Sequence, residues 1–246
     1  MVTILISYKD AYEKIFNDLL DLNILFWFMH KKGKVRLRVY EDELELVKKI
    51  IEEKESTYTV IAYEPEVNIF GGENLIGKIH LLLCSIATWI LEVQRNERLA
   101  ECNESDLDAI YLRFINHLVS CFELDDFETW DVWCKVVSHR RIDLEKYRGI
   151  ILSKMFDVYS GVYEVDRINQ VESQNETVAL ERMEQIIKDI CMIYYSEKCE
   201  RGIRGIISSI IIFTFNMMKE SSGKQAGFSH IMYMLNNPDI RRVIDL

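Results

Sequence analysis

A cluster of positive charge is the part of the sequence whose residue types and spacing best suit binding chemistry. Five cations fall within residues 31–38 of a chain whose formal net charge is −10. Alternate side chains of a strand share one face, so Lys34, Arg36 and Arg38 would lie in one row with Tyr40. Cations bind phosphate groups, and a tyrosine ring can stack on a base. The predicted binding residues are Lys31, Lys32, Lys34, Arg36, Arg38 and Tyr40.

The same strand has two plainer interpretations. Antiparallel sheets often have one solvated face that carries charged side chains, and this row would then bind nothing. Alternatively, the cations could form the surface on which the acidic remainder of the chain docks. A nucleic-acid or nucleotide-binding role for the basic strand therefore stands beside these two structural roles.

Local signatures of catalysis are absent from the sequence. It contains no nucleophile elbow, no glycine-rich phosphate loop and no pair of metal ligands at a recognised spacing. The sequence therefore predicts no catalytic residue, no metal site and no cofactor. An enzyme would have to assemble its site from dispersed residues, such as His80, His117, His139 and Arg204.

The basic strand belongs to a β-α-β-β-α-β order in the first domain, residues 1–63. The patterns predict strands at 2–8, 24–30, 35–40 and 57–63, with helices at 9–21 and 42–55. Gly33 can supply the positive φ of a hairpin turn. This order resembles the ferredoxin-like folds, which include small-molecule-sensing and RNA-binding modules, and in which two helices cover one face of a four-stranded sheet. The cations would then line the opposite face.

The rest of the chain reads as helical. Residues 64–73 have no clear period and few apolar anchors, so they form the predicted linker to a second domain at 74–246. The stretch 206–218 has no polar stripe and is too short to span a membrane, which predicts a central buried helix. Further helices are expected at 74–96, 105–119, 125–138, 143–159, 175–198, 226–235 and 238–244. The predicted class is α+β, a small ferredoxin-like domain followed by a larger all-α domain.

Composition limits the cellular setting. The six cysteines include no Cys-x-x-Cys pair, which is typical of buried thiols in a reducing compartment. The N-terminus has no positive leader before an apolar run, so we expect a cytoplasmic protein. The acidic balance argues against a general attraction to nucleic acid or to an anionic membrane.

These observations favour a non-enzymatic regulatory or accessory protein, of the kind that a phage, virus or mobile element carries, which acts by binding a protein partner. A nucleic-acid or nucleotide-binding regulator that uses the basic strand is the first alternative. An enzyme with a site built from dispersed residues is the second.

Overall fold

The computed structural model describes residues 1–7, 12–31, 33–63, 66–96, 104–140, 174–197, 199 and 201–240, without the side chains of 104–106. Lys32, the helix expected at 143–159 and residues 241–244 of the last expected helix lie outside these ranges.

The N-terminal part folds as its pattern predicted. Its elements are β1 (Val2–Ser7), α1 (Tyr12–Asp21), β2 (Phe26–Lys31), β3 (Lys34–Val39), a 3-10 turn (Glu41–Glu43), α2 (Leu44–Glu53) and β4 (Tyr58–Ala62). The four strands pair antiparallel in the order β2-β3-β1-β4. Gly33 has a φ of 75° in the β2–β3 hairpin, which is the left-handed backbone that the turn needs.

The first face of this sheet forms a core with α1 and α2. Leu37 lies in one cross-strand row with Phe28 and Ile4, and all three side chains are buried. The Phe28 ring packs against that of Phe16 on α1, with ring centroids 4.5 Å apart. Apolar residues at alternate strand positions thus explain why both helices lie on this side of the sheet.

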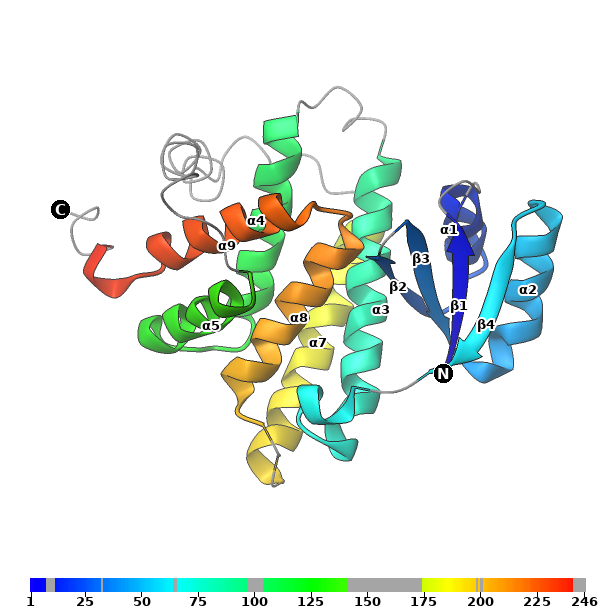
Figure 1. Ribbon diagram of the computed structural model, residues 1–246. Coiled ribbons are helices and arrows are strands. Elements are labelled where there is room, and N and C mark those ends of the chain that lie inside the picture. Colours follow the sequence, from blue (N-terminus) through cyan, green and yellow to red (C-terminus); the bar gives the residue numbers. More distant parts are fainter. Residues whose placement is uncertain are drawn as a thin grey trace.

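The remainder of the described chain is helical, so the fold is α+β (Figure 1). Its elements are the 3-10 helix η2 (Val67–Phe70), α3 (Glu73–Arg95), α4 (Glu104–Ser120), α5 (Asp126–His139), α7 (Gln174–Ser196), α8 (Ile203–Met217) and α9 (Ser222–Leu235).

Helix α8 is the buried element expected at 206–218, and it contacts both parts of the chain. Its Phe213 ring lies 5.7 Å from that of Trp27 in β2 and 5.1 Å from that of Phe70 in η2. Gly71 has a φ of 89°, and a Cβ there would stand 2.7 Å from Cδ1 of Ile206. The segment expected to have few apolar anchors is therefore anchored by Phe70, and the division into two domains stays a prediction.

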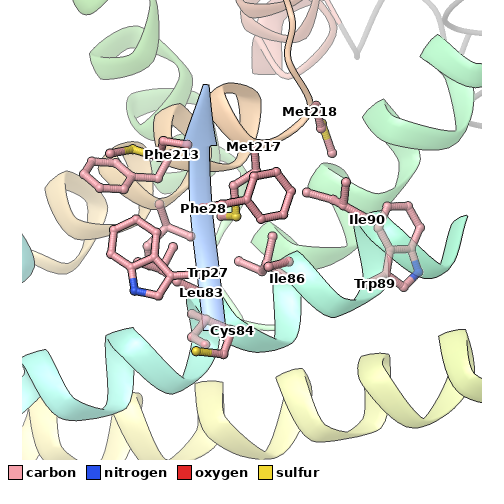
Figure 2. Close-up of a cluster of buried hydrophobic side chains, with 14 of the residues drawn as sticks. Trp27, Phe28, Leu83, Cys84, Ile86, Trp89, Ile90, Phe213, Met217 and Met218 are labelled. Atoms are coloured by element: carbon pink, nitrogen blue, oxygen red, sulfur yellow. The ribbon is translucent and has the colours of Figure 1, made fainter. Parts of the chain in front are cut away.

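The second face of the sheet meets the helical part at β2. Helices α3 and α8 both contact this strand. Figure 2 shows Trp27 grouped with Leu83 and Cys84 of α3 and with Phe213 of α8. The ferredoxin-like part and the helices consequently share one continuous hydrophobic core.

Two helix starts show how polar side chains set the element bounds. Asp125 begins α5 with a capping box, because its side chain accepts from the Glu128 amide and the Glu128 carboxylate accepts from the Asp125 amide. Helix α9 begins at Ser222 instead of residue 226. The Ser221 hydroxyl accepts a hydrogen bond from the Lys224 amide, so this serine caps α9 rather than closing α8.

Helix α3 is long enough and apolar enough to cross a membrane by length and composition. However, 67% of its apolar stretch is buried inside the protein. That burial is typical of a core helix of a soluble protein.

Candidate functional site

The predicted basic strand is divided by the structure into an open end and a buried end. Lys31 and Lys34 are exposed and Arg36 is half-buried, whereas Arg38 keeps only 5% of its surface exposed. The expectation that Lys34, Arg36 and Arg38 form one exposed row is therefore wrong at Arg38. The reason is that α3 and α8 cover this end of the sheet, which the strand sequence alone does not reveal.

Arg38 is held by aromatic rings. The strand register places it between Trp27 and Thr3, with Ile61 next in the row. Its Cζ lies 4.3 Å from the centroid of the Trp27 ring and 5.1 Å from that of Tyr63. Its Nε and Nη1 are buried without a hydrogen-bond partner in the described part of the chain. Burial lowers the pKa of Arg38, but a guanidinium starts so high that the charge persists at neutral pH.

A tyrosine–histidine contact links the end of β4 to α3, next to Arg38. The Tyr63 hydroxyl and Nε2 of His80 are 2.6 Å apart. Burial, followed by the positive charges of the N-terminus and Arg38, lowers the pKa of His80 to about 4. Burial raises the pKa of Tyr63 to about 12. Both groups are neutral at pH 7, so their contact joins the sheet to α3 and is poorly suited to exchange protons there.

Tyr40 is the other member of the predicted row that turns toward the helices. It is half-buried, and its pKa is raised by burial and then by the neighbouring Cys84 thiol of α3. Its ring is thus less available for stacking on a base than the strand pattern suggests. Lys31 at the end of β2 and Lys34 and Arg36 of β3 remain as accessible cations of the hairpin, and none of them makes an ion pair with a carboxylate within the described ranges.

Strand β4 forms the outer edge of the sheet, and nothing in the sequence analysis singled it out. Val60 and Ile61 are 38% and 39% exposed, and they point to opposite faces. Tyr58 donates a hydrogen bond of 2.8 Å to the Glu52 carboxylate of α2, which fixes one end of the strand. The resemblance of the element order to ferredoxin-like folds was the signal that could have placed β4 at an edge.

A cleft of about 820 Å³ lies between the end of α1 and helices α3 and α7. Several of its polar side chains bond to one another. Arg95 donates to Asp21 at 2.9 Å and lies 3.6 Å from Glu92, and Asn175 donates to Glu92 at 3.5 Å. These bonds tie the walls together, so much of the polar lining is already satisfied by protein groups.

The dispersed residues considered for an enzyme have separate partners. His80 bonds to Tyr63, Arg204 pairs with Asp131 at 3.2 Å, and His139 lies in the last turn of α5. His117 of α4 lies in a different group, with Cys121 just beyond the end of α4 and Glu184 on α7. No hydrogen bond or ion pair between described residues joins any two members of the proposed set.

The His117 group combines three side chains that are potential metal ligands. Nε2 of His117 is 3.0 Å from Oε1 of Glu184 and 3.7 Å from Sγ of Cys121. Burial, followed by the negative charge of Glu184, raises the pKa of Cys121 to about 11. The i,i+4 spacing of histidine and cysteine was visible in the sequence, but their partner comes from a helix more than sixty residues away.

Comparison with known proteins supplies a fold and no family. No protein-family model matches the chain, and no curated protein matches it. Among solved structures, the chain is similar to the tRNA dependent lantibiotic dehydratase MibB from Microbispora sp. 107891, with 12% identity and a TM-score of 0.63. The match covers 100% of this chain and 28% of the dehydratase, so the chain spans little more than a quarter of that protein's length. At this identity the likeness shows the fold alone.

Proposed function

We propose that this protein is a regulatory or accessory protein that binds an extended segment of a partner protein along the outer edge of β4. The observation that supports this role is the open, apolar edge itself. Edge strands present unpaired backbone donors and acceptors, and an added strand satisfies them. The proposed interaction is therefore β-strand addition.

The composition of β4 suits an added strand. Natural edge strands are commonly protected by charged residues, by proline or by a covering element. The five residues of β4 include no charge and no proline, and four of them are exposed. The opposite edge strand, β2, differs because α3 and α8 contact it. The side chains of Val60 and Ile61 would flank the added strand on its two faces.

The structural neighbour is compatible with an accessory role. In the lantibiotic dehydratase the matching region makes up 28% of a longer chain, so there this fold works beside other parts of a protein. We infer that the present chain likewise acts next to another protein surface. The five described cysteines are free thiols, which suits a reducing compartment and supports the proposed cytoplasmic location.

Two lysine substitutions test the edge. Ile61→Lys should abolish capture of the partner from host extract, because a charge on an edge strand opposes strand addition. Leu46→Lys is the matched control, since Leu46 is a similarly exposed apolar residue on α2, at 43%. The captured protein is then purified, and its binding is measured with both variants. Equal binding by wild type and Ile61→Lys would contradict the proposal.

A nucleic-acid-binding role is the second candidate, because Lys31, Lys34 and Arg36 stay accessible at one end of the sheet. The neighbour's description as tRNA dependent gives a reason to test tRNA as well as single-stranded RNA. If three cations contact phosphates, the logarithm of affinity should fall with that of salt concentration at a slope of about −2. Lys34→Glu with Arg36→Glu should remove binding. Unchanged RNA binding by this variant would exclude the strand as the site.

A further inference from the structure

We propose that His117, Cys121 and Glu184 bind a Zn²⁺ ion with three protein ligands. This site lies on α4 and α7, away from the β4 edge, and does not depend on the proposed strand addition. One candidate ligand atom from each side chain lies within 4.8 Å of the other two. The group thus converges on a common point instead of forming a chain of surface contacts.

The spacing of the donor atoms suits a tetrahedral ion. Typical Zn–N, Zn–O and Zn–S bond lengths place a tetrahedral nitrogen about 3.4 Å from an oxygen ligand and about 3.6 Å from a sulfur ligand. In the structure Nε2 of His117 lies 3.0 Å from the Glu184 oxygen and 3.7 Å from the Cys121 sulfur. These two distances need shifts of only a few tenths of an ångström, and the Glu184 oxygen, which lies within 4.8 Å of the Cys121 sulfur, would settle at about 3.6 Å from it around the ion.

The chemistry of the three donors selects the metal. A thiolate and an imidazole are ligands that zinc prefers, whereas Mg²⁺ and Ca²⁺ take oxygen ligands almost entirely. Three protein ligands leave the fourth tetrahedral position to water or to an added ligand, which is the arrangement of zinc sites with an open position. The His117 and Glu184 side chains are each 41% exposed, so an ion can enter from solvent.

The supporting helices hold the donors in place. Cys121 directly follows the last residue of α4, and its amide donates to the His117 carbonyl at 3.1 Å, which continues the helical turn and puts the two side chains on the same side. Their neighbour Leu118 and the Glu184 neighbour Ile187 are fully buried, so both helices are fixed by the core. A bound ion would link α4 to α7. The exposed Lys188, whose charge acts on Cys121, opposes a cation at this position.

The test is titration of the purified full chain with Zn²⁺ and, as a spectroscopic substitute, Co²⁺. Wild type should bind one ion at this site and show a thiolate-to-cobalt charge-transfer band. Cys121→Ser should lose that band, and both Cys121→Ser and His117→Ala should weaken zinc binding at least tenfold. Cys134→Ser, a half-buried thiol on α5, is the control and should bind like wild type. Lys188→Gln should bind zinc more tightly.

A second measurement uses the unmodified protein, so that misfolding of a variant cannot decide the outcome. Saturating Zn²⁺ should slow alkylation of Cys121 by iodoacetamide, as measured by peptide mass spectrometry, and leave the rate at Cys134 unchanged. The proposal is overturned if Zn²⁺ leaves the Cys121 rate unchanged. It is equally overturned if folded Cys121→Ser and His117→Ala bind zinc like wild type, since the contact of His117 with Glu184 would then be an ordinary ion pair.

Discussion

Charge reversal on β3 should change the free energy of unfolding very little at Arg36 and severely at Arg38, although both residues lie on the same strand face. Arg36 is half-buried, whereas Arg38 is 5% exposed between the rings of Trp27 and Tyr63. An Arg36→Glu change should alter the free energy of unfolding by less than about 1 kcal/mol, as surface changes usually do. An Arg38→Glu change should be severe, because it replaces a cation stacked on two rings by a buried anion.

The magnitude at Arg38 follows from its contacts. Each cation–π contact contributes about 0.5 to 2 kcal/mol, and an uncompensated buried charge costs about 3 to 5 kcal/mol. Arg38→Glu should therefore lower the free energy of unfolding by at least about 4 kcal/mol, which is most of the stability of a marginal domain. Arg38→Met should cost far less, because removing the unpaired Nε and Nη1 groups offsets the lost ring contacts.

Urea denaturation of the three variants, followed by circular dichroism, provides the measurement. We predict that Arg36→Glu and Arg38→Met are nearly as stable as wild type, and that Arg38→Glu is far less stable. The double variant Arg36→Glu with Arg38→Glu would be stable if the strand were fully exposed. We expect it to be as unstable as Arg38→Glu alone, because it buries the same anion at position 38. The structural reasoning is refuted if Arg38→Glu unfolds within 1 kcal/mol of wild type.

Further perturbations test the contact of His80 with Tyr63, the burial of α8, and the close approach of Gly71 to Ile206. The pKa of His80 falls from 6.5 to about 4 on folding, so the unfolded state binds the proton more readily. The free energy of unfolding should therefore decrease as the pH is lowered from about 6.5 to about 4. The loss should reach about 3 kcal/mol, and it should be absent in His80→Gln when urea midpoints are measured across pH. Ile210→Asp should lower the free energy of unfolding by several kcal/mol, because Ile210 is fully buried. The control Phe127→Asp, at a 59% exposed position, should leave the melting temperature nearly unchanged. Equal melting temperatures for the two variants would contradict the packing of α8. Gly71→Ala should lower the free energy of unfolding by about 1 to 3 kcal/mol, because the residue has a positive φ and a Cβ there would clash with Ile206. Gly77→Ala, in open space on α3, should be neutral or stabilising. Denaturation midpoints in the reverse order would contradict this geometry.

Local patterns were enough to predict the class of the fold and the elements that the structure describes. Alternation in the strands and the glycine at residue 33 located the hairpin, and the absence of a polar stripe marked α8 as a buried helix. These signals are local because they depend on backbone conformation and on which side chains avoid water. The start of α9 was placed too late because a serine can end one helix or cap the next.

Contacts between distant segments could not be predicted in the same way. Arg38 looked like its neighbour Arg36, and only the packing of α3 and α8 on β2 distinguishes them. The group of His117, Cys121 and Glu184 likewise requires knowing that α4 and α7 bring their side chains together. The open edge at β4 depends on strand order, which the element sequence suggests only through its resemblance to a known topology.

Amide hydrogen exchange of β4 in the presence of the purified partner tests strand addition most directly. An added strand would hydrogen-bond to the backbone groups of residues 58–62 that point away from β1. We predict that the β4 amides slow on binding, that those of α2 do not change, and that the Ile61→Lys variant shows no slowing. Unchanged exchange at β4 in a complex that demonstrably forms would contradict strand addition and place the partner on another surface.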